Sequence, residues 1–284
     1  MQEQWTTVIK PKTGWRDINL KELWQYRDLI YLFVKRNFAT LYKQTILGPL
    51  WIIIAPVFST LISTFIFGTV AKIPSDGVPY FLFYMCGNVA WTYFSSCLTS
   101  TSTTFTGNAG IFGKVYFPRL VMPISTVITG LLNLAIQSLI FVAFLIGYGI
   151  AGAAISVTWM LALVPALVLQ MALLGLGCGI IISSMTTKYR DLNVLVGFGV
   201  SAWMYITPII YSVNSLDAES LWRKVCMINP MAPVVEIMRN AFLGTPVSEN
   251  LFPFWGLSIG ITFVILFIGV VMFSKVEKTF MDTV

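Results

Sequence analysis

Residues 120–187 read LVMPISTVITGLLNLAIQSLIFVAFLIGYGIAGAAISVTWMLALVPALVLQMALLGLGCGIIISSMTT, and this stretch contains no Asp, Glu, Lys, Arg or His. One helical crossing of a bilayer needs ~20 apolar residues, so the stretch is long enough for two crossings. The same absence of charge recurs over residues 44–71, 77–113, 192–216 and 250–274. With 57% hydrophobic and 11% charged residues, the composition lies outside the range of soluble globular domains. The sequence therefore predicts an all-α membrane protein.

Six crossings are expected, at roughly 47–71, 80–105, 119–149, 156–186, 193–213 and 252–274. An even number of crossings puts both termini on the same side of the membrane. If that side is the cytoplasm, 14 of the 18 Lys and Arg residues fall in inner segments and the other four in outer loops. Positive charge is typical of cytoplasmic segments, so we expect a multi-pass protein with both termini cytoplasmic. The net charge of +6 then marks membrane topology, and nucleic acid is not expected as a partner.

Residues 20–43 predict an amphipathic helix that does not cross the membrane. At about 100° per residue, one face of this helix is apolar and the opposite face is charged. The apolar face holds Leu23, Tyr26, Ile30, Val34, Phe38 and Leu41, and the charged face holds Lys21, Asp28, Lys35, Arg36 and Lys43. We expect this helix to lie flat at the cytoplasmic membrane interface, with packing on a partner protein as the alternative. Residues 1–43 thus form a cytoplasmic extension with an interface helix, and residues 44–284 form the transmembrane domain.

The longest external connection, about 214–249, is apolar for a loop. It contains two apolar pieces of ~10 residues separated by Asn229 and Pro230, and each piece is too short to cross a bilayer. Such pieces fit re-entrant helices that dip into the membrane and act as a gate. Helices resting on lipid headgroups fit the same pattern equally well.

The chain offers little enzymatic chemistry. It contains no His, and no pair of carboxylates lies within an apolar span, so we expect no metal site and no catalytic residues. The segment from Gly110 to Lys114 fails as a phosphate-binding loop, because Asn108 and Val115 stand where Gly and Ser or Thr are required. The expected cytoplasmic loops, 106–118 and 187–192, are too short to hold a nucleotide-binding domain. Any ATP-driven work therefore requires a separate subunit.

Hydroxyl groups are dense in the second half of the crossing at 80–105. The run comprises Ser95, Ser96, Thr99, Ser100, Thr101, Ser102, Thr103, Thr104 and Thr106. These groups either bond back to their own helix and to neighbouring helices or line a polar passage near the cytoplasmic mouth. Aromatic residues are also abundant within the spans, and a subset of them lining a passage would stack against sugar faces.

Four motifs together resemble one family. They are YKQTILGPLW at 42–51, GKVYFPR at 113–119, KYRDL at 188–192 and NPMAP at 229–233. In this order they resemble the ABC-2 type permeases of bacterial polysaccharide ABC exporters, and the resemblance covers nearly the whole chain. The N-terminal extension through Trp15 and Ile18 is most similar to that of O-antigen exporters, whereas capsule and wall teichoic acid relatives are shorter.

The resemblance implies an exporter in the bacterial inner membrane with two copies of this chain and two ATP-binding cassette subunits. ATP and Mg would be bound by those partner subunits and not by this chain. Short cytoplasmic segments dock the ATPases in this family, which makes six residues candidates for coupling: Lys114, Tyr116, Arg119, Tyr189, Arg190 and Asp191. The external loop would form the gate, with Trp222, Asn229, Pro230, Glu236 and Arg239 as its candidate residues.

The resemblance also implies a substrate. This family typically moves a glycan linked to undecaprenyl pyrophosphate from the inner to the outer leaflet through a channel between two permeases. Arg36 and Lys43 of the basic interface helix become candidate contacts for the substrate headgroup. The candidate channel lining comprises Phe58, Phe65, Tyr84, Trp91, Ser95, Thr99 and Tyr205. The alternatives are an ABC-2 drug or lipid efflux permease, a teichoic acid exporter, or a membrane-embedded glycan or acyl transferase.

Overall fold

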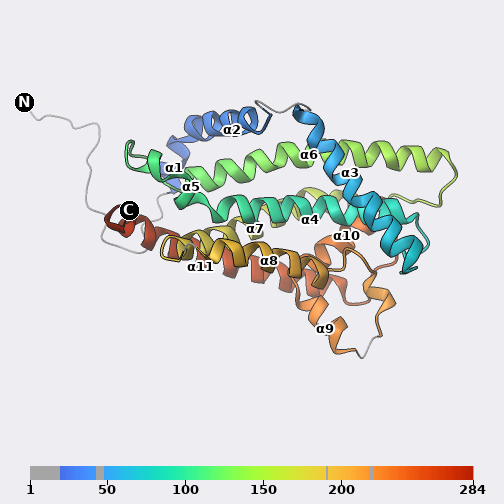
Figure 1. The fold of residues 1–284 in the computed structure, drawn as a ribbon. Coiled ribbons are helices and arrows are strands. Elements are labelled where there is room, and N and C mark those ends of the chain that lie inside the picture. The colour runs from blue at the N-terminus through green and yellow to red at the C-terminus, as the bar shows by residue number, and fades with distance from the viewer. Residues whose placement is uncertain (1–19, 43–47, 190, 218–219, 284) are drawn as a thin grey trace, which may run out of the picture.

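The computed structural model describes residues 20–42, 48–189, 191–217 and 220–283, and every regular element within these ranges is helical (Figure 1). In chain order the elements are α1 (Leu20–Gln25), α2 (Arg27–Tyr42), η1 (Gly48–Leu50), α3 (Trp51–Ser63), η2 (Thr64–Val70), α4 (Tyr80–Ser102), α5 (Thr104–Phe112), α6 (Val121–Ile150), η3 (Trp159–Leu163), α7 (Val164–Thr186), α8 (Leu192–Ile206), η4 (Val213–Ser215), α9 (Leu221–Ile228), α10 (Met231–Leu243) and α11 (Leu251–Thr283). This confirms the all-α fold class. α5 lies within the segment expected to be a loop, and η2 continues α3 as a π-helix.

The bundle is elongated, and its two ends are built from different elements (Figure 1). At one end α1, α5 and the C-terminal part of α11 gather, and we call this the α5 end. Toward the opposite end lie α9, α10 and the connection that follows α6, and we call this the α10 end. Segments that are far apart in the sequence are thus brought together at each end.

Within the described ranges, four helical stretches are long and apolar enough to cross a membrane. They are Trp51–Val70, Val121–Ile150, Trp159–Thr186 and Leu251–Glu277. The crossing expected at 80–105 corresponds to α4, in which polar side chains dilute the apolar ones over 23 residues. The crossing expected at 193–213 corresponds to α8, which has only 15 residues, fewer than the ~20 of a full crossing. Length and composition thus give four crossings, against the six expected from the sequence.

The centre of the bundle is formed by α4 and α7. α4 packs between α6 and α7, and α7 packs in turn on α11. Glycines allow these close approaches, because a Cβ added at Gly179 would lie 2.5 Å from the Cβ of Thr101, and one at Gly177 would lie 3.0 Å from the Cα of Leu266. Gly175 likewise faces α4. These glycines therefore give α7 a small-residue seam on two sides.

α2 runs alongside the N-terminal half of α6 (Figure 1). Phe33 is buried, and its ring centroid lies 5.8 Å from that of Phe117. Tyr26 and Ile30, both on the predicted apolar face, pack on the same cluster. α2 therefore packs along α6, and the expectation that it lies flat at the membrane interface stays a prediction. An apolar stripe shows which residues of a helix avoid water, but it does not show whether that face contacts lipid or a neighbouring helix.

The segment expected to form the longest external connection contains a pair of helices. α9 and α10 are separated by Asn229 and Pro230, and we call this helix–turn–helix the hairpin. α10 is almost entirely buried and contacts α4, α7 and α11. α10 is thus a core helix of the α10 end, and α9 is the more exposed half of the hairpin.

Candidate functional site

A polar pocket of about 540 Å³ lies between α2, α4 and α6. The pocket is lined by Arg36, Asn37 and Thr40 of α2, by Ser96, Cys97 and Ser100 of α4, and by Thr126, Thr129, Gly130 and Asn133 of α6. On α4 the pair Ser96 and Ser100, and on α2 the pair Arg36 and Thr40, are four residues apart. Residues at this spacing lie on one face of a helix, so each helix turns a polar stripe toward the pocket. This makes the pocket the candidate site for a polar ligand.

Arg36 supplies the positive charge of the pocket. Its Nε and Nη2 donate to Oδ1 of Asn37 at 3.3 and 3.1 Å, and its Cζ lies 4.6 Å from the centroid of the Phe33 ring. The guanidinium is therefore held in place by its own helix and retains further donors for a ligand. Lys43, the other predicted headgroup contact, lies outside the described residues.

Threonine hydroxyls in the pocket donate to their own helices. Thr40, Thr126 and Thr129 each donate from Oγ1 to the carbonyl oxygen four residues earlier, at 2.8, 3.0 and 2.8 Å. A hydroxyl has one hydrogen, so each of these oxygens can only accept a further hydrogen bond. The pocket thus combines acceptor oxygens with the donors of Arg36.

The lining residues on α4 differ from the predicted ones by one position. Ser95 and Thr99 were predicted to line a passage, but the pocket is lined by Ser96 and Ser100. Ser95 and Thr99 instead donate to carbonyl oxygens of α4, at 3.2 and 2.8 Å. In a run with hydroxyls on every face, the sequence does not show which face meets a neighbouring helix. The signal that sequence reasoning missed lies in α6, where Thr126, Thr129 and Asn133 recur at a spacing of three to four residues in an otherwise apolar segment.

The predicted aromatic lining divides into two groups. Phe58 of α3, Phe65 of η2 and Tyr205 of α8 are exposed, with 60–64% of each residue accessible. Tyr84 and Trp91 of α4 are buried in the core, at 1% and 5%, and cannot line a passage in this arrangement. The abundance of aromatics in spans does not separate lining from packing residues, because both environments favour them.

The predicted gate residues are mostly buried. Asn229, Glu236 and Arg239 lie in the protein interior, whereas Trp222 is exposed. Both carboxylate oxygens of Glu236 accept hydrogen bonds from Ser248, one from its backbone N–H and one from its hydroxyl. Burial raises the pKa of Glu236, and the bonds from Ser248 oppose that shift. The buried residues therefore stabilise the packing of the hairpin against the rest of the protein. The prediction of a gate did not include this structural role.

The predicted coupling residues gather near the α5 end, and they differ in exposure. Lys114, Tyr116, Tyr189 and Asp191 are exposed, and Arg190 lies outside the described residues. Arg119 is half-buried, and its guanidinium donates to the backbone carbonyl of Glu277 while its backbone N–H donates to the Glu277 carboxylate. Arg119 therefore ties the start of α6 to α11 and has a structural role of its own.

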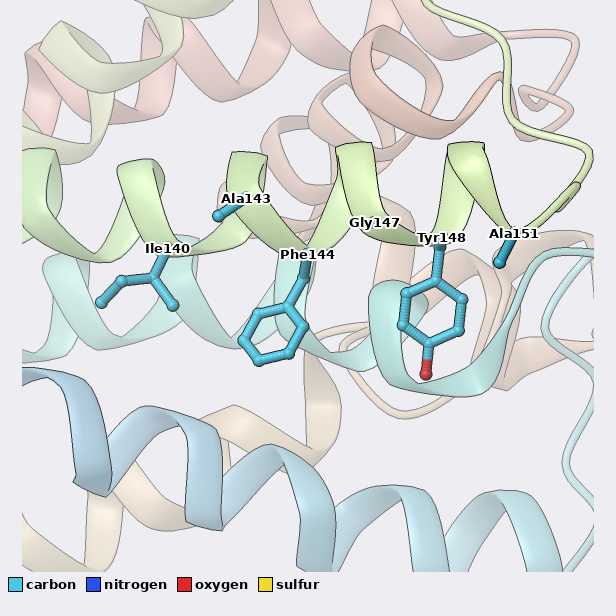
Figure 2. Close-up of a pocket in the computed structure, with 6 residues that line it drawn as sticks. All are labelled: Ile140, Ala143, Phe144, Gly147, Tyr148 and Ala151. Atoms are coloured by element: carbon cyan, nitrogen blue, oxygen red, sulfur yellow. The ribbon is translucent and has the colours of Figure 1, made fainter.

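An apolar pocket of about 440 Å³ lies along the last turns of α6 (Figure 2). The side chains of Ile140, Phe144 and Tyr148 project to the same side of the helix in Figure 2. The rings of Phe144 and Tyr148 contact Phe81 of α4, with centroids 4.9 and 6.2 Å apart. This lining carries no charged group and suits an apolar chain, not a sugar or a phosphate. No cluster of metal-ligating side chains occurs among the described residues.

Comparison with known proteins gives a consistent set of relatives. The profile of the ABC-2 type transporter family matches residues 28–243. An O-antigen export system permease protein, RfbA, of Klebsiella pneumoniae is 27% identical over 255 residues, which cover 90% of this chain and 94% of that protein. An RfbA of Myxococcus xanthus is 27% identical over 76% of this chain and 80% of its own length. The polysialic acid transport protein KpsM of Escherichia coli is 26% identical over 87% of this chain and 93% of its own.

Proposed function

Because this chain belongs to the ABC-2 type transporter family, we propose that it is the permease of an ATP-driven exporter that moves a lipid-linked, O-antigen-like polysaccharide across the inner membrane. The relatives named for O-antigen export and polysialic acid transport support polysaccharide as the cargo class. The observation that carries the proposal is the polar pocket beside Arg36, which contrasts with two other pockets whose linings are apolar.

Arg36 contacts the pyrophosphate of an undecaprenyl-pyrophosphate-linked glycan in this proposal. A guanidinium binds phosphate through charge-assisted hydrogen bonds, and Arg36 lies at the pocket. Ser96, Ser100 and the threonines of α6 then meet the first sugars, because hydroxyl-rich surfaces suit carbohydrate. Lys43, which follows α2 directly in the sequence and lies outside the described residues, is the second candidate contact for the same headgroup.

A second copy of the chain completes the channel. α8 has no buried residue in the isolated chain, and α3 is exposed along most of its length. Phe58 of α3, Phe65 of the η2 segment that continues it, and Tyr205 of α8 are exposed, so they supply the aromatic lining between the copies. In this assembly α4 and α8 complete six crossings per chain, and the α5 end faces the cytoplasm.

Two ATP-binding cassette subunits drive the transport. The family implies association with such a partner, and this chain acts as a permease rather than as an enzyme. ATP and Mg belong to the partner subunits. Lys114, Tyr116, Tyr189 and Asp191 offer exposed side chains near the α5 end, where the partner would dock.

Export should depend on Arg36 and not on a neighbouring arginine. In a strain that lacks this gene, Arg36→Gln should reduce surface polysaccharide strongly, while Arg27→Gln should restore it like the wild type. Arg27 is the matched control because it lies on the same helix, is exposed and does not line the pocket. Equal surface polysaccharide with both variants, at equal protein levels, would remove Arg36 from the substrate site.

The other functions make different predictions. A drug or lipid efflux permease would change drug resistance or lipid asymmetry and leave surface polysaccharide intact when deleted. A teichoic acid or capsule exporter would change that polymer instead of O-antigen. A membrane-embedded transferase would leave unmodified glycan in the outer leaflet, whereas loss of an exporter leaves finished lipid-linked glycan in the inner leaflet. Assaying where the lipid-linked glycan accumulates separates these cases.

A further inference from the structure

The C-terminal end of α8 is bound to the hairpin by buried side chains. Nε1 of Trp203 donates to Oδ1 of Asn229 at 2.9 Å, and Nδ2 of Asn229 donates to Oγ1 of Thr207 at 2.8 Å. The same Oδ1 also accepts from the backbone N–H of Met231 at 3.0 Å. One asparagine therefore connects the last turn of α8 to the first turn of α10.

Arg239 makes a second connection at the same place. Its guanidinium donates to the backbone carbonyl oxygens of Pro208, at 2.6 Å, of Ile209, and of Tyr211, at 3.3 Å. Its Cζ also lies 3.6 Å from the centroid of the Phe83 ring of α4. These carbonyls follow the C-terminal end of α8, so a buried positive charge lies where the helix dipole is negative.

The hairpin is in turn fixed to the rest of the bundle. Ser258 of α11 donates from Oγ to the carbonyl oxygen of Pro230 at 2.6 Å. Gln170 of α7 donates to Ser258 at 2.6 Å and accepts from Nε1 of Trp255 at 2.8 Å. Because α10 is itself buried, the C-terminal end of α8 is anchored through the hairpin to α4, α7 and α11.

The N-terminal part of α8 is held much more weakly. Among the described residues, no side-chain hydrogen bond joins the segment 192–202 to another helix. Instead, an apolar cavity of about 350 Å³ lies between this part of α8 and the bundle. Val196, Gly199 and Val200 line it from α8, and Leu98, Cys178 and Ile265 are among the residues that line it from α4, α7 and α11. α8 therefore combines a fixed C-terminal end with an apolar cavity along the part that precedes it, from Val196 to Trp203.

We propose that α8 works as a lever that pivots about Trp203, with Asn229 and Arg239 as positioning residues, and that its N-terminal end swings into the apolar cavity during transport. The lever begins directly after residues 188–191, so a push on that connection would move the free end of the helix. Movement at the fixed end would break several hydrogen bonds to the hairpin, whereas no side-chain hydrogen bond among the described residues joins 192–202 to another helix and opposes movement there. This inference rests on the proposed function for the ATPase that supplies the push.

Filling the cavity tests the lever. A Cβ added at Gly199 meets no atom within 4 Å, so Gly199→Ala fits the present structure. Because Gly199 lines the cavity, Gly199→Val and Gly199→Leu add increasing side-chain volume where the swing needs space. Gly260 of α11 is the matched control, because its added Cβ also meets nothing and it does not line the cavity. Export should fall stepwise along the Gly199 series, by about tenfold for Gly199→Leu, and stay at the wild-type level for Gly260→Leu. Wild-type export by Gly199→Leu would overturn the proposal.

Distances between spin labels test the pivot itself. One pair joins Val194, near the free end of α8, to Phe267 of α11, and the other joins Tyr205, at the fixed end, to Ile228 of the hairpin; all four side chains are exposed. In the complex with its ATPase in lipid nanodiscs, trapping with ATP and vanadate should change the first distance and leave the second unchanged. In Arg239→Met the second distance should broaden or change as well. A wild-type complex in which the second distance changes as much as the first would contradict a fixed pivot.

The two proposals fail in different ways. If the chain is not an ATP-driven exporter, then no ATPase complex forms and surface polysaccharide does not depend on the gene. If only the lever is wrong, then export and ATPase activity are intact, while the Gly199 series behaves like the Gly260 control.

Discussion

Gly179→Ala should destabilise the protein through the packing of α4 on α7. The added Cβ would lie 2.5 Å from the Cβ of Thr101 and 2.9 Å from the carbonyl oxygen of Leu98. Carbon atoms in contact prefer separations of roughly 3.5–4.0 Å, so the two helices must move apart by about 1 Å or distort locally. The contact involves the backbone of α4, so rotation of a flexible side chain cannot relieve it.

The expected loss follows from the cost of overpacking a close-packed core. Inserting a methylene into a filled interior typically costs about 1–3 kcal/mol, and the contact with backbone favours the middle of this range, about 2 kcal/mol. Gly199→Ala is the matched control, since its Cβ meets no atom within 4 Å. Ala also favours a helix over Gly by roughly 0.5–1 kcal/mol, so the control should be neutral or slightly stabilised.

Reversible unfolding of the purified protein in mixed micelles, followed by circular dichroism while the fraction of denaturing detergent is raised, measures this difference. Gly179→Ala should unfold at a lower detergent fraction than the wild type, and Gly199→Ala should not. Coincident unfolding curves for the wild type and Gly179→Ala would refute the assignment of the α4–α7 contact as a close-packed seam.

Further variants test the buried arginines and the α5 end. Arg239→Met leaves the backbone carbonyls after α8 without their donor and should lower the free energy of unfolding by about 3 kcal/mol, measured in the same detergent titration. Arg119→Ala removes the guanidinium bond to the Glu277 carbonyl, although the backbone N–H can still donate to the Glu277 carboxylate, and should lower both thermal stability and export. Tyr189→Ala changes an exposed side chain and should keep the melting temperature while it lowers ATPase stimulation in the complex. A Tyr189→Ala complex with normal stimulation would exclude this side chain from coupling.

Charge patterning was enough to predict most of the helices, for a physical reason. Ionised side chains are costly in hydrocarbon, so the borders of the charge-free stretch 120–187 closely mark the start of α6 and the end of α7. The break at Asn229 and Pro230 was likewise predictable, because proline does not continue a preceding helix. The end of α8 was not, since apolar residues continue through Ile209 and Ile210 and hide the break at Thr207.

The sequence was less informative about which face of a helix meets which neighbour. It predicted Arg36 as a ligand contact, and the structure places Arg36 at the polar pocket, but the partners Ser96 and Thr129 come from distant segments. The polar residues of α4 and α6 can be assigned to the pocket only when the packing of the neighbouring helices is known. Tyr84 illustrates the converse, because an aromatic residue in a span is equally compatible with a core and with a channel wall.

The threonine bonds in the polar pocket have a consequence for what it can hold. Thr40, Thr126 and Thr129 each donate their hydroxyl hydrogen to their own helix. Toward a ligand, each hydroxyl oxygen can therefore act only as a hydrogen-bond acceptor. A sugar hydroxyl can donate to such an oxygen, while a phosphate oxygen carries no proton to give. For the lipid-linked glycan of the proposed function, the directionality of these bonds would separate its two parts, with the sugars donating to the threonines and the phosphates accepting from Arg36. A carbohydrate chain held only through its own hydrogens can exchange one threonine for the next with little loss, which suits a polymer that must keep moving.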